Sequence, residues 1–372
     1  MSPEPPPLSR REFLYAAAAA TIAIQPLSAQ PAPPPPKKLG VALVGVGSLT
    51  MGQLLPALAK SDLCRPVALI SGHPDKAHRQ ALLYNIDPKN IYNYENFDTI
   101  KDNPDIDIVY IVLPNGMHAD YTIRAAQAGK HVLCEKPMAN TVEECQSMID
   151  AAAAADRKLM IAYRMRYEPM TIRAIELSHS ATDVGTIKQI TAEAGFNAGD
   201  PNQWRLNKKL AGGGPLMDMG IYALNAIRYL SSQEPAEVSA FTYATPNDPR
   251  FKEVEETIAI ELRFDSGLLA SILSTYSFNC NRFRLYGTHG QLESEPIQAY
   301  TNSRLWFTHS GTPKQEITYT PVNHFATEMD HFADSIQNNK PVLTPGEEGL
   351  KDLKVMIAAY ESARIGKAVK IV

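Results

Sequence analysis

Residues 39–50 read LGVALVGVGSLT, an apolar-rich run followed by a glycine turn. The apolar run is typical of a buried strand, and the residues after the turn are expected to open a helix. Gly45 permits a tight turn, and Gly47 lets the backbone approach a pyrophosphate, whose charge the helix N-terminus stabilises. Thr50 occupies the third position, where Gly or Ala is usual, and this departure loosens the motif. Strand, turn and helix together predict a dinucleotide-binding fold.

The composition is that of an ordinary globular protein. The chain has 372 residues, which at roughly 150 residues per domain predicts two domains. With 44% hydrophobic and 20% charged residues, fibrous and disordered classes are excluded. A formal net charge of -4 argues against a nucleic-acid or anionic-membrane surface, so the partner is a small molecule or a protein. The four cysteines form no C-x-x-C pair, so neither a metal cluster nor a disulfide scaffold is expected.

The N-terminus carries the features of an export signal. Ser9-Arg10-Arg11-Glu12-Phe13-Leu14 precedes an apolar stretch at 15–24, and Leu27-Ser28-Ala29 forms a small-residue cleavage site. We therefore expect a twin-arginine signal over residues 1–29, export by that machinery and a periplasmic location. A membrane anchor is the alternative, but the apolar stretch is shorter than the roughly 20 residues that span a bilayer, so no stable insertion is expected. Residues 30–38 form a proline-rich arm.

From residue 39 onward, short apolar runs alternate with helical periods, which is typical of a parallel sheet with crossover helices. The expected strands are 39–44, 66–70, 108–113, 131–134 and 159–162. The expected helices are 53–60, 75–84, 119–128 and one from about 142 to 155. The last of these begins after a capping box, Thr141-Val142-Glu143-Glu144. The fold class is therefore α/β, with a doubly wound Rossmann domain over residues 39–160.

After about residue 180, apolar and polar residues alternate with a period of two, which is typical of half-buried strands. The expected strands are 187–194, 237–244, 257–264, 268–276 and 282–286. They predict a large, mainly antiparallel sheet with one covered face and one open face. Helices at 325–338 and 347–365 close an α+β domain over residues 161–372, which is expected to bind substrate. The open face suggests a homodimer or homotetramer.

The end of the second strand bears on the cofactor. An NAD site usually places Asp or Glu about 20 residues beyond the glycine turn, on the ribose 2′-hydroxyl. Here Ser71-Gly72-His73 stands at that place, with Lys76 and Arg79 following. A missing carboxylate beside cations suits a 2′-phosphate, so NADP is favoured over NAD. The alternative is that Lys76 and Arg79 are solvated helix residues.

Three further segments bring polar groups toward one edge of the predicted sheet. The segments 113–118 and 134–137 follow strands, and ligands bind at the carboxyl ends of parallel strands. The segment 212–222, GGGPLMDMGIY, reads as a glycine turn that leads into a helix. On that helix Asp218 and Tyr222 are four residues apart and share a face.

Together these motifs resemble the glucose-fructose oxidoreductase branch of the Gfo/Idh/MocA family of sugar oxidoreductases. The resemblance runs from residue 39 onward and includes Glu135-Lys136-Pro137, residues 212–222, Gln203-Trp204-Arg205 and residues 345–349. It implies that Lys136 lies beside the nicotinamide and the reacting carbon, and that Tyr222 is the acid/base. Many members of the wider family carry His where Tyr222 stands, so the tyrosine points to this branch.

The chemistry of sugar oxidation supports these roles independently. Oxidation of an aldose at C1 needs a hydride acceptor and a base for the hydroxyl proton, and reduction of a ketose needs the same group as an acid. A lysine cation beside a phenol favours the phenolate. Asp218 is expected to orient the sugar and to keep Lys136 charged. The predicted catalytic residues are therefore Lys136, Tyr222 and Asp218.

The resemblance also implies a set of binding residues. Asn115, His118 and Glu135 would contact the nicotinamide half, and Trp204 and Arg205 would stack on and hydrogen-bond a sugar. The full predicted cofactor-binding set is Gly45, Gly47, Ser48, Leu49, Ser71, Gly72, Lys76, Leu113, Pro114, Asn115, His118, Glu135, Lys136, Arg164, Trp204, Arg205 and Tyr222. The predicted substrate-binding residues are Lys136, Arg166, Asp218 and Tyr222. Arg166 departs from the close pattern, in which His is expected.

Structural alternatives remain for several of these residues. Tyr222 and Trp204 could be core aromatics, Asp218 could be a helix-turn residue, and His118 could be a helix-start residue.

Export and NADP use together constrain the mechanism. The periplasm offers no soluble NADP pool, so the cofactor must be bound tightly before the folded protein is exported. A second substrate must then reoxidise it in place, which favours a ping-pong exchange. An aldose would be oxidised to the lactone, and fructose or another aldose would be reduced to an alditol. The alternatives are a simple NADP-dependent aldose dehydrogenase, an NAD-dependent glycosidase of the same family and a non-catalytic sugar sensor.

Overall fold

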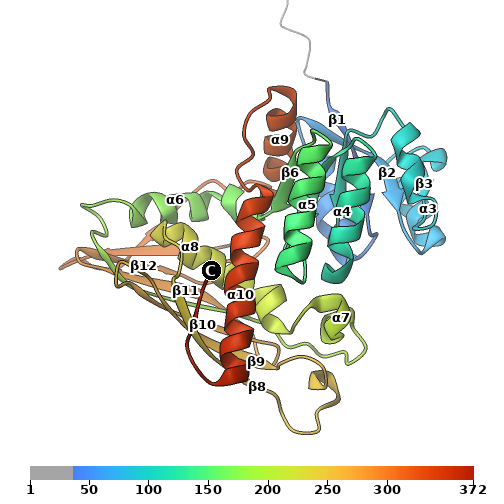
Figure 1. The fold of residues 1–372 in the computed structure, drawn as a ribbon. Coiled ribbons are helices and arrows are strands. Elements are labelled where there is room, and N and C mark those ends of the chain that lie inside the picture. Colours follow the sequence, from blue (N-terminus) through green and yellow to red (C-terminus); the bar gives the residue numbers. More distant parts are fainter. Residues whose placement is uncertain (1–36) are drawn as a thin grey trace, which may run out of the picture. The chain divides into compact units, whose positions relative to one another are not determined.

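The computed structural model describes residues 37–372. The predicted signal segment 1–29 and the arm residues 30–36 lie outside the described residues. Residues 38–372 form one compact unit that contains two sheets (Figure 1). In the part of the chain that the structure describes, no helix is both long and apolar enough to cross a membrane.

The first sheet is the predicted doubly wound parallel sheet. Its order is β3 (Ile91–Tyr92), β2 (Cys64–Ile70), β1 (Leu39–Val44), β4 (Ile108–Ile111), β5 (His131–Glu135) and β6 (Leu159–Ala162). All neighbouring strands are parallel, and β1 and β4 are buried along their whole length because helices cover both faces. Strand β3 has two residues and was not predicted. The predicted boundary after residue 160 falls inside β6, and it stays a prediction.

Helices from distant parts of the chain cover the two faces of this sheet. One face packs against α4 (His118–Gln127) and α5 (Val142–Ala154), which lie side by side in Figure 1. The other face packs against α2 (Leu55–Leu58), α3 (Pro74–Leu83) and α9 (His324–Gln337). Because Phe325, Met329 and Phe332 of α9 join this core, the C-terminal part of the chain completes the Rossmann domain.

The capping box before α5 forms as predicted. The Thr141 hydroxyl accepts from the backbone N–H of Glu144 at 3.1 Å, and the Glu144 carboxylate accepts from the backbone N–H of Thr141 at 3.1 Å. The short helices of this half are η1 (Thr50–Leu54), η2 (Pro88–Asn90), η3 (Phe97–Asp102), η4 (Asn115–Met117) and η5 (Arg164–Tyr167).

The second sheet is mixed and mostly antiparallel. Its order is β14 (Gln315–Ile317), β13 (Leu305–His309), β12 (Gly290–Ser294), β11 (Cys280–Gly287), β7 (Ile187–Gly195), β10 (Leu269–Thr275), β9 (Thr257–Arg263), β8 (Glu237–Tyr243) and β15 (Val369–Lys370). Only the pairing of β7 with β10 is parallel among the named strands. Strands β12 to β15 were not predicted.

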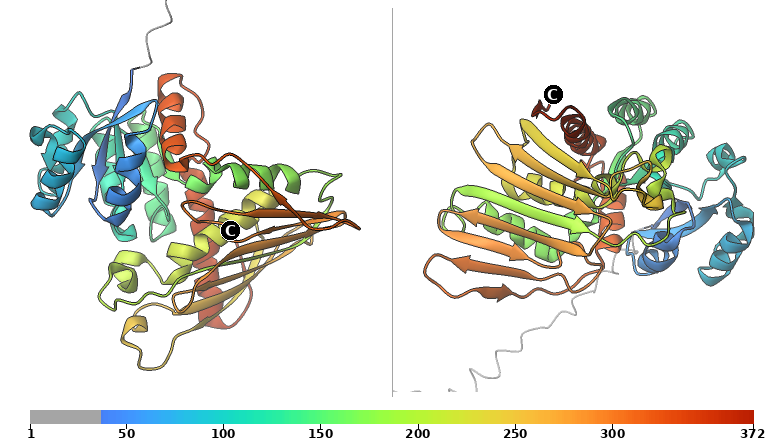
Figure 2. Two further views of the ribbon diagram at one scale, coloured as in Figure 1. Left: turned by 180° about the vertical axis from the view of Figure 1, so that it is seen from behind. Right: turned by 90° about the horizontal axis from the view of Figure 1, so that it is seen from below.

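One face of the second sheet is covered by helices. These are α6 (Pro169–Ser178), α8 (Ile221–Ser231) and α10 (Gly346–Ile365), and in the right-hand view of Figure 2 the strands lie in front of α6 and α8. The remaining short helices are η6 (Trp204–Leu206), α7 (Lys208–Ala211), η7 (Leu216–Gly220) and η8 (Pro249–Phe251). Phe241 and Leu269 project from the opposite face with exposed side chains. Use of that face for oligomerisation stays a prediction.

A buried ionic cluster joins the two sheets through Asp352 of α10. Its carboxylate accepts hydrogen bonds from the Tyr163 hydroxyl at 2.5 Å, from Asn225 Nδ2 at 2.5 Å and from Arg228 Nη1 at 2.7 Å. Tyr163 follows β6, whereas Asn225 and Arg228 lie on α8. Asp352 is fully buried, and such a charge is tolerated only because it is paired and hydrogen-bonded. The cluster therefore fixes α8 to the end of β6.

Substitution Asp352→Ala should lower the free energy of unfolding by about 3 kcal/mol, because it leaves the buried Tyr163, Asn225 and Arg228 donors without their shared acceptor, although Arg228 keeps its ion pairs with two glutamates. Chemical denaturation with urea measures the loss. The matched control is Glu361→Ala on the same helix, since the Glu361–Arg364 pair is exposed and should leave the stability nearly unchanged. Equal stability of the two variants would contradict this role for Asp352.

Candidate active site

A cavity of about 770 Å³ opens at the carboxyl ends of β1, β4 and β5. Its wall also includes residues of η5, η6, η7, α8, α9 and the 298–300 loop, so both sheets contribute to it. The predicted site residues in the wall are Gly45, Gly47, Ser48, Leu49, Ser71, Lys76, Leu113, Pro114, Asn115, Glu135, Lys136, Arg164, Trp204, Arg205, Asp218 and Tyr222. The structure thus brings together almost all of the residues that the sequence singled out.

The glycine turn has the geometry that a pyrophosphate needs. Gly45 has φ +98°, and a Cβ there would lie 2.3 Å from the carbonyl oxygen of Val112, so only glycine fits. A Cβ on Gly47 would meet nothing within 4 Å, because this residue borders the open cavity. The buried Thr50 hydroxyl donates to the Gly45 carbonyl at 2.5 Å and closes the turn. Threonine at the third position is therefore compatible with the glycine turn, because its hydroxyl stabilises that turn. The turn fits a dinucleotide.

The residues at the carboxyl end of β2 fit a phosphorylated ribose. The Ser71 hydroxyl accepts from the backbone N–H of His73 at 3.0 Å, and Ser71, His73 and Lys76 all line the cavity. The acidic residues of the described cavity wall are Glu135 and Asp218, which come from β5 and η7 rather than from this end. A 2′-phosphate would therefore meet a hydroxyl and a cation here.

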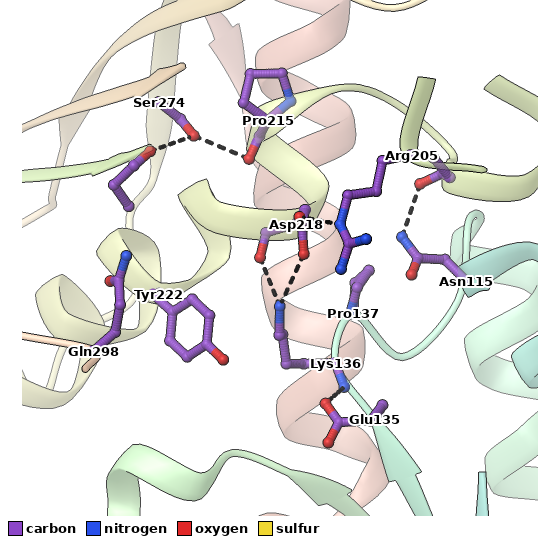
Figure 3. A network of polar contacts seen from close by, with 12 residues as sticks. Asn115, Glu135, Lys136, Pro137, Arg205, Pro215, Asp218, Tyr222, Ser274 and Gln298 are labelled. Carbon is purple, nitrogen blue, oxygen red and sulfur yellow. Dashed lines mark hydrogen bonds and ion pairs between the residues drawn. The ribbon is translucent and has the colours of Figure 1, made fainter. Parts of the chain in front are cut away.

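Asp218 lies at the centre of the polar network in Figure 3. Lys136 Nζ donates to the Asp218 backbone oxygen at 2.6 Å and to Oδ1 at 3.3 Å. On the other side of the carboxylate, Oδ2 accepts from Arg205 Nε at 2.7 Å and from the Tyr276 hydroxyl at 3.2 Å. These donors come from the end of β5, from η6 and from the residue after β10. Asp218 therefore joins three separate segments at one point.

The charges around Asp218 and Lys136 keep both side chains ionised. Burial alone would raise the pKa of Asp218, but Arg205 and then Lys136 lower that pKa to about 2. Burial likewise disfavours the lysine cation, yet Tyr222 and Asp218 together raise the pKa of Lys136 above its usual value. With a side chain only 11% exposed, Lys136 is a largely desolvated cation that stays charged. The predicted effect of Asp218 on Lys136 matches this geometry.

Tyr222 lies between two cations. Lys136 Nζ is 4.5 Å from the centre of the Tyr222 ring, and Arg164 Nε donates to the Tyr222 hydroxyl at 3.3 Å. Arg164 is held by the carbonyl oxygens of Gln298, at 2.5 Å, and Ala299, at 3.4 Å. The Tyr222 hydroxyl therefore borders the cavity with a hydrogen-bond donor beside it, which is the position that a proton-transferring group needs.

Three predicted residues lie outside the cavity wall. The ring nitrogens of the fully buried His118 lie 2.8 and 2.9 Å from the carbonyl oxygens of Leu113 and Pro137, so this residue holds two loops in place. Gly72 lies beside the Tyr94 ring, and a Cβ on Gly72 would lie 3.0 Å from that ring. The Arg166 guanidinium lies 4.0 Å from the centre of the Tyr229 ring and does not reach the cavity.

Several residues of the wall were missed by the sequence analysis. They are Val46, His73, Tyr94, Val112, Phe196, Met219, Gln298, Ala299, Tyr300 and Phe325. Tyr300 and Phe325 flank the Arg164 guanidinium, which lies 4.9 and 5.5 Å from the two ring centres. Both belong to the last quarter of the chain, and Phe325 reaches the wall because α9 packs on the Rossmann sheet. His73 belongs to the Ser71-Gly72-His73 segment that follows β2, and this position at the carboxyl end of a strand is the signal that could have placed it in the wall.

The four cysteines lie outside the cavity wall. Cys64, Cys134 and Cys145 are buried free thiols, and Cys280 is half-buried. Burial is the main reason that the pKa of Cys280 rises to about 11. Within residues 37–372, no three His, Cys, Asp or Glu side chains gather in a way that could hold a metal ion.

Residues 39–163 match the model of an oxidoreductase family, described as its NAD-binding Rossmann fold. Residues 181–371 match the C-terminal alpha/beta domain of the same oxidoreductase family. The chain belongs to the Gfo/Idh/MocA family of oxidoreductases. The predicted family, fold class and oxidoreductase activity are thereby confirmed, whereas the roles assigned to single residues stay predictions.

Individual relatives are also similar over nearly the whole chain. The crystal structure of aldose-aldose oxidoreductase from Caulobacter crescentus, complexed with glycerol, is 44% identical, with a TM-score of 0.87. The match covers 90% of this chain and 100% of that one. D-xylose 1-dehydrogenase [NADP(+)] from Haloarcula marismortui is 31% identical over 342 residues, covering 89% of this chain and 92% of the relative. A second D-xylose 1-dehydrogenase, from Haloferax volcanii, is 31% identical over 338 residues, covering 90% of this chain and 98% of the relative.

The lowered pKa of Asp218 predicts a pH-dependent contribution to stability. Its ionised form is favoured by folding, so the contribution is complete above the unfolded value of 3.8 and is lost as the pH falls through about 2. The unfolding free energy of the wild type minus that of Asp218→Asn should therefore fall by about 2 kcal/mol across this window. Denaturation at several pH values measures it, and a difference that does not change with pH would contradict the assignment.

Proposed function

We propose that this protein is an NADP-dependent sugar oxidoreductase that retains its cofactor and exchanges hydride between two sugars. An aldose such as glucose is oxidised at C1 to the lactone, and fructose or a second aldose is then reduced to an alditol. The observation that carries the proposal is the position of Tyr222, whose ring lies against Lys136 and whose hydroxyl accepts from Arg164, in a cavity that extends to the glycine turn. The similarity to the Caulobacter aldose-aldose oxidoreductase supports it.

The chain's own residues supply binding, orientation and proton transfer. When bound, the nicotinamide cofactor accepts and returns the hydride. Tyr222 takes the proton of the donor hydroxyl and returns one to the carbonyl oxygen of the acceptor. Lys136 and Arg164 lie beside Tyr222 and position it through both steps, and Asp218 keeps Lys136 charged and in place. Asn115, whose amide donates to the Ala211 carbonyl at 2.8 Å, fixes the wall beside them.

The preference for NADP rests on Ser71 and Lys76. A hydroxyl and a cation line the wall where a carboxylate would select the free ribose of NAD. The two haloarchaeal relatives are D-xylose 1-dehydrogenases that carry NADP(+) in their names. These relatives also favour a second candidate function, a simple NADP-dependent aldose dehydrogenase whose cofactor exchanges with solution.

Export completes the proposal. Arg10 and Arg11, followed by an apolar stretch, support transport of the folded protein to the periplasm by the twin-arginine route. A cofactor bound in the cytoplasm would travel with the folded chain, and retention of the cofactor then requires two sugar substrates.

The protein purified without added cofactor should contain a bound nicotinamide. An aldose should raise the absorbance of the reduced ring, and a second sugar should return it to its starting level. Reduction without reoxidation by any sugar would favour the dehydrogenase, and absence of reduction by every aldose tested would overturn the proposal.

Substitution Tyr222→Phe should abolish both half-reactions and leave the cofactor bound, because it removes the proton-transferring hydroxyl and keeps the ring. Turnover and bound nicotinamide are measured on the same preparation. Tyr229→Phe is the matched control, since Tyr229 lies on the same helix outside the main cavity and its hydroxyl has no hydrogen-bond partner in residues 37–372. Near-normal turnover of Tyr222→Phe would remove Tyr222 from the acid/base role.

Substitution Ser71→Asp should shift cofactor preference toward NAD. A carboxylate at this position repels a 2′-phosphate and accepts a hydrogen bond from a free 2′-hydroxyl. The ratio of dissociation constants for NADP and NAD, measured on protein stripped of cofactor, reports the change. An unaltered ratio would count against Ser71 as the determinant of selectivity.

Replacement of both Arg10 and Arg11 by Lys should leave the full-length protein in the cytoplasm. The twin-arginine pair is the recognised feature of the signal, so charge alone does not replace it. Cell fractionation with immunodetection measures the distribution. Equal amounts of wild type and variant in the periplasmic fraction would contradict the export proposal.

A further inference from the structure

Three successive glycines at 212–214 lead into the helix that carries Asp218 and Tyr222. Among the three, only Gly212 has a positive φ, so backbone conformation does not explain the other two. A Cβ on Gly213 would lie 2.1 Å from the Tyr360 hydroxyl oxygen. A Cβ on Gly214 would lie 2.3 Å from the backbone oxygen of Glu255 and 2.8 Å from its carboxyl carbon. These two glycines therefore make room for Tyr360 and Glu255.

Glu255 supplies acceptors to the start of this helix. Its Oε2 accepts from the backbone N–H of Gly214 at 2.9 Å, and its Oε1 accepts from the backbone N–H of Leu216 at 3.4 Å. The first N–H groups of a helix have no partner within the helix, and the N-cap residue here, Pro215, has no side-chain cap. A side chain 41 residues further along the chain than Gly214 therefore provides the cap.

Two further side chains hold Glu255 and the helix start in place. Tyr360 of α10 donates its hydroxyl to Glu255 Oε1 at 2.8 Å, so the carboxyl group has a fixed orientation. The Ser274 hydroxyl of β10 lies 2.9 Å from the backbone oxygens of Pro215 and Ala194, as Figure 3 shows for Pro215. Glu255, Tyr360 and Ser274 all lie outside the described cavity wall. They can therefore affect the chemistry only through the helix.

The start of the helix determines where the catalytic groups lie. Asp218 is about one turn beyond Gly214, and Tyr222 is about one turn beyond Asp218. Lys136 Nζ donates to the backbone oxygen of Asp218 at 2.6 Å and lies 4.5 Å from the centre of the Tyr222 ring. A shift of the helix start therefore moves both contacts of the lysine together. A misplacement of about 1 Å can slow an enzymatic reaction by about 100-fold.

We propose that Glu255 is a positioning residue for hydride transfer: its carboxyl group fixes the start of the helix and thereby places Asp218 and Tyr222 against Lys136. This inference rests on the proposed function, which gives Asp218 and Tyr222 their roles. It also assigns a purpose to the glycine segment at 212–214, which admits Glu255 and its partner Tyr360.

The rate of hydride transfer in a single half-reaction tests the proposal. Protein with its bound cofactor is mixed with a saturating aldose, and the absorbance of the reduced nicotinamide is followed with time. Glu255→Ala should slow the transfer by about 10- to 100-fold, because the helix start loses its acceptor. The dissociation constant of the cofactor should change by less than about two-fold, because Glu255 lies outside the cavity wall.

The conservative variant separates hydrogen bonding from packing. In Glu255→Gln, the amide oxygen can accept from the Gly214 N–H, and the amide nitrogen can donate to the Tyr360 hydroxyl. This variant should therefore transfer hydride within about three-fold of the wild-type rate. Equal loss of rate in Glu255→Ala and Glu255→Gln would contradict the capping role.

Glu256→Ala is the matched control. Glu256 is the adjacent residue, is buried outside the cavity wall, and accepts from the backbone N–H of Thr245 at 2.6 Å and from the Ser277 hydroxyl. Its loss should disturb the same segment before β9 and change the rate by less than about two-fold. A wild-type rate in Glu255→Ala, or an equal loss in Glu256→Ala, would overturn the proposal.

Hydrogen exchange provides a second measurement that does not depend on turnover. The backbone N–H groups of residues 212–222 should exchange faster by about ten-fold or more in Glu255→Ala, and should keep wild-type protection in Glu256→Ala. If Glu255→Ala does not fold, Tyr360→Phe should show a smaller increase in the same segment, because it removes only the donor that orients Glu255. Unchanged protection in the variant measured would overturn the proposal. Failure of every aldose to reduce the wild type would instead overturn the proposed function, and the exchange would still report on Glu255.

Discussion

The carboxylate of Asp218 is the contact on which the geometry of the site depends. It holds Lys136 from the Rossmann sheet, Arg205 from η6 and Tyr276 from the end of β10, so three segments that are distant in sequence meet at one buried anion. Because the anion is paired with two cations, it stays ionised and keeps Lys136 charged despite burial. Tyr222 lies one helical turn further on, and its ring is therefore placed against a fixed cation.

The C-terminal part of the chain supports this site, with a wall residue from α9 and a buried carboxylate from α10. Helix α9 covers one face of the Rossmann sheet and brings Phe325 into the cavity wall. Helix α10 places Asp352 between Tyr163, which directly precedes Arg164, and α8, which carries Tyr222. The catalytic groups thus depend on helices that follow them by more than a hundred residues. This dependence explains why residues 38–372 form a single compact unit although two sheets are present.

The sequence predicted those elements whose formation depends on interactions between residues close together in the chain. The glycine turn, the capping box at Thr141 and the longer strands of the Rossmann sheet follow from hydrophobic period and turn chemistry. Strands β3, β14 and β15 were missed because each has only two or three residues and is defined by its neighbours. Most of the motif residues line one cavity, whereas Tyr300 and Phe325 carry no motif and reach the wall through tertiary packing alone. His118 belongs to a motif, yet it is directed at two backbone carbonyls because it holds loops together.

The dependence of Lys136 on Asp218 is tested most directly by a double-mutant cycle on the rate of hydride transfer. Lys136→Met, Asp218→Asn and the double variant are compared with the wild type in a single half-reaction. If Asp218 acts through Lys136, the double variant should be no slower than Lys136→Met, to within about two-fold. Rate losses that multiply in the double variant would contradict the coupling and would assign Asp218 a separate role.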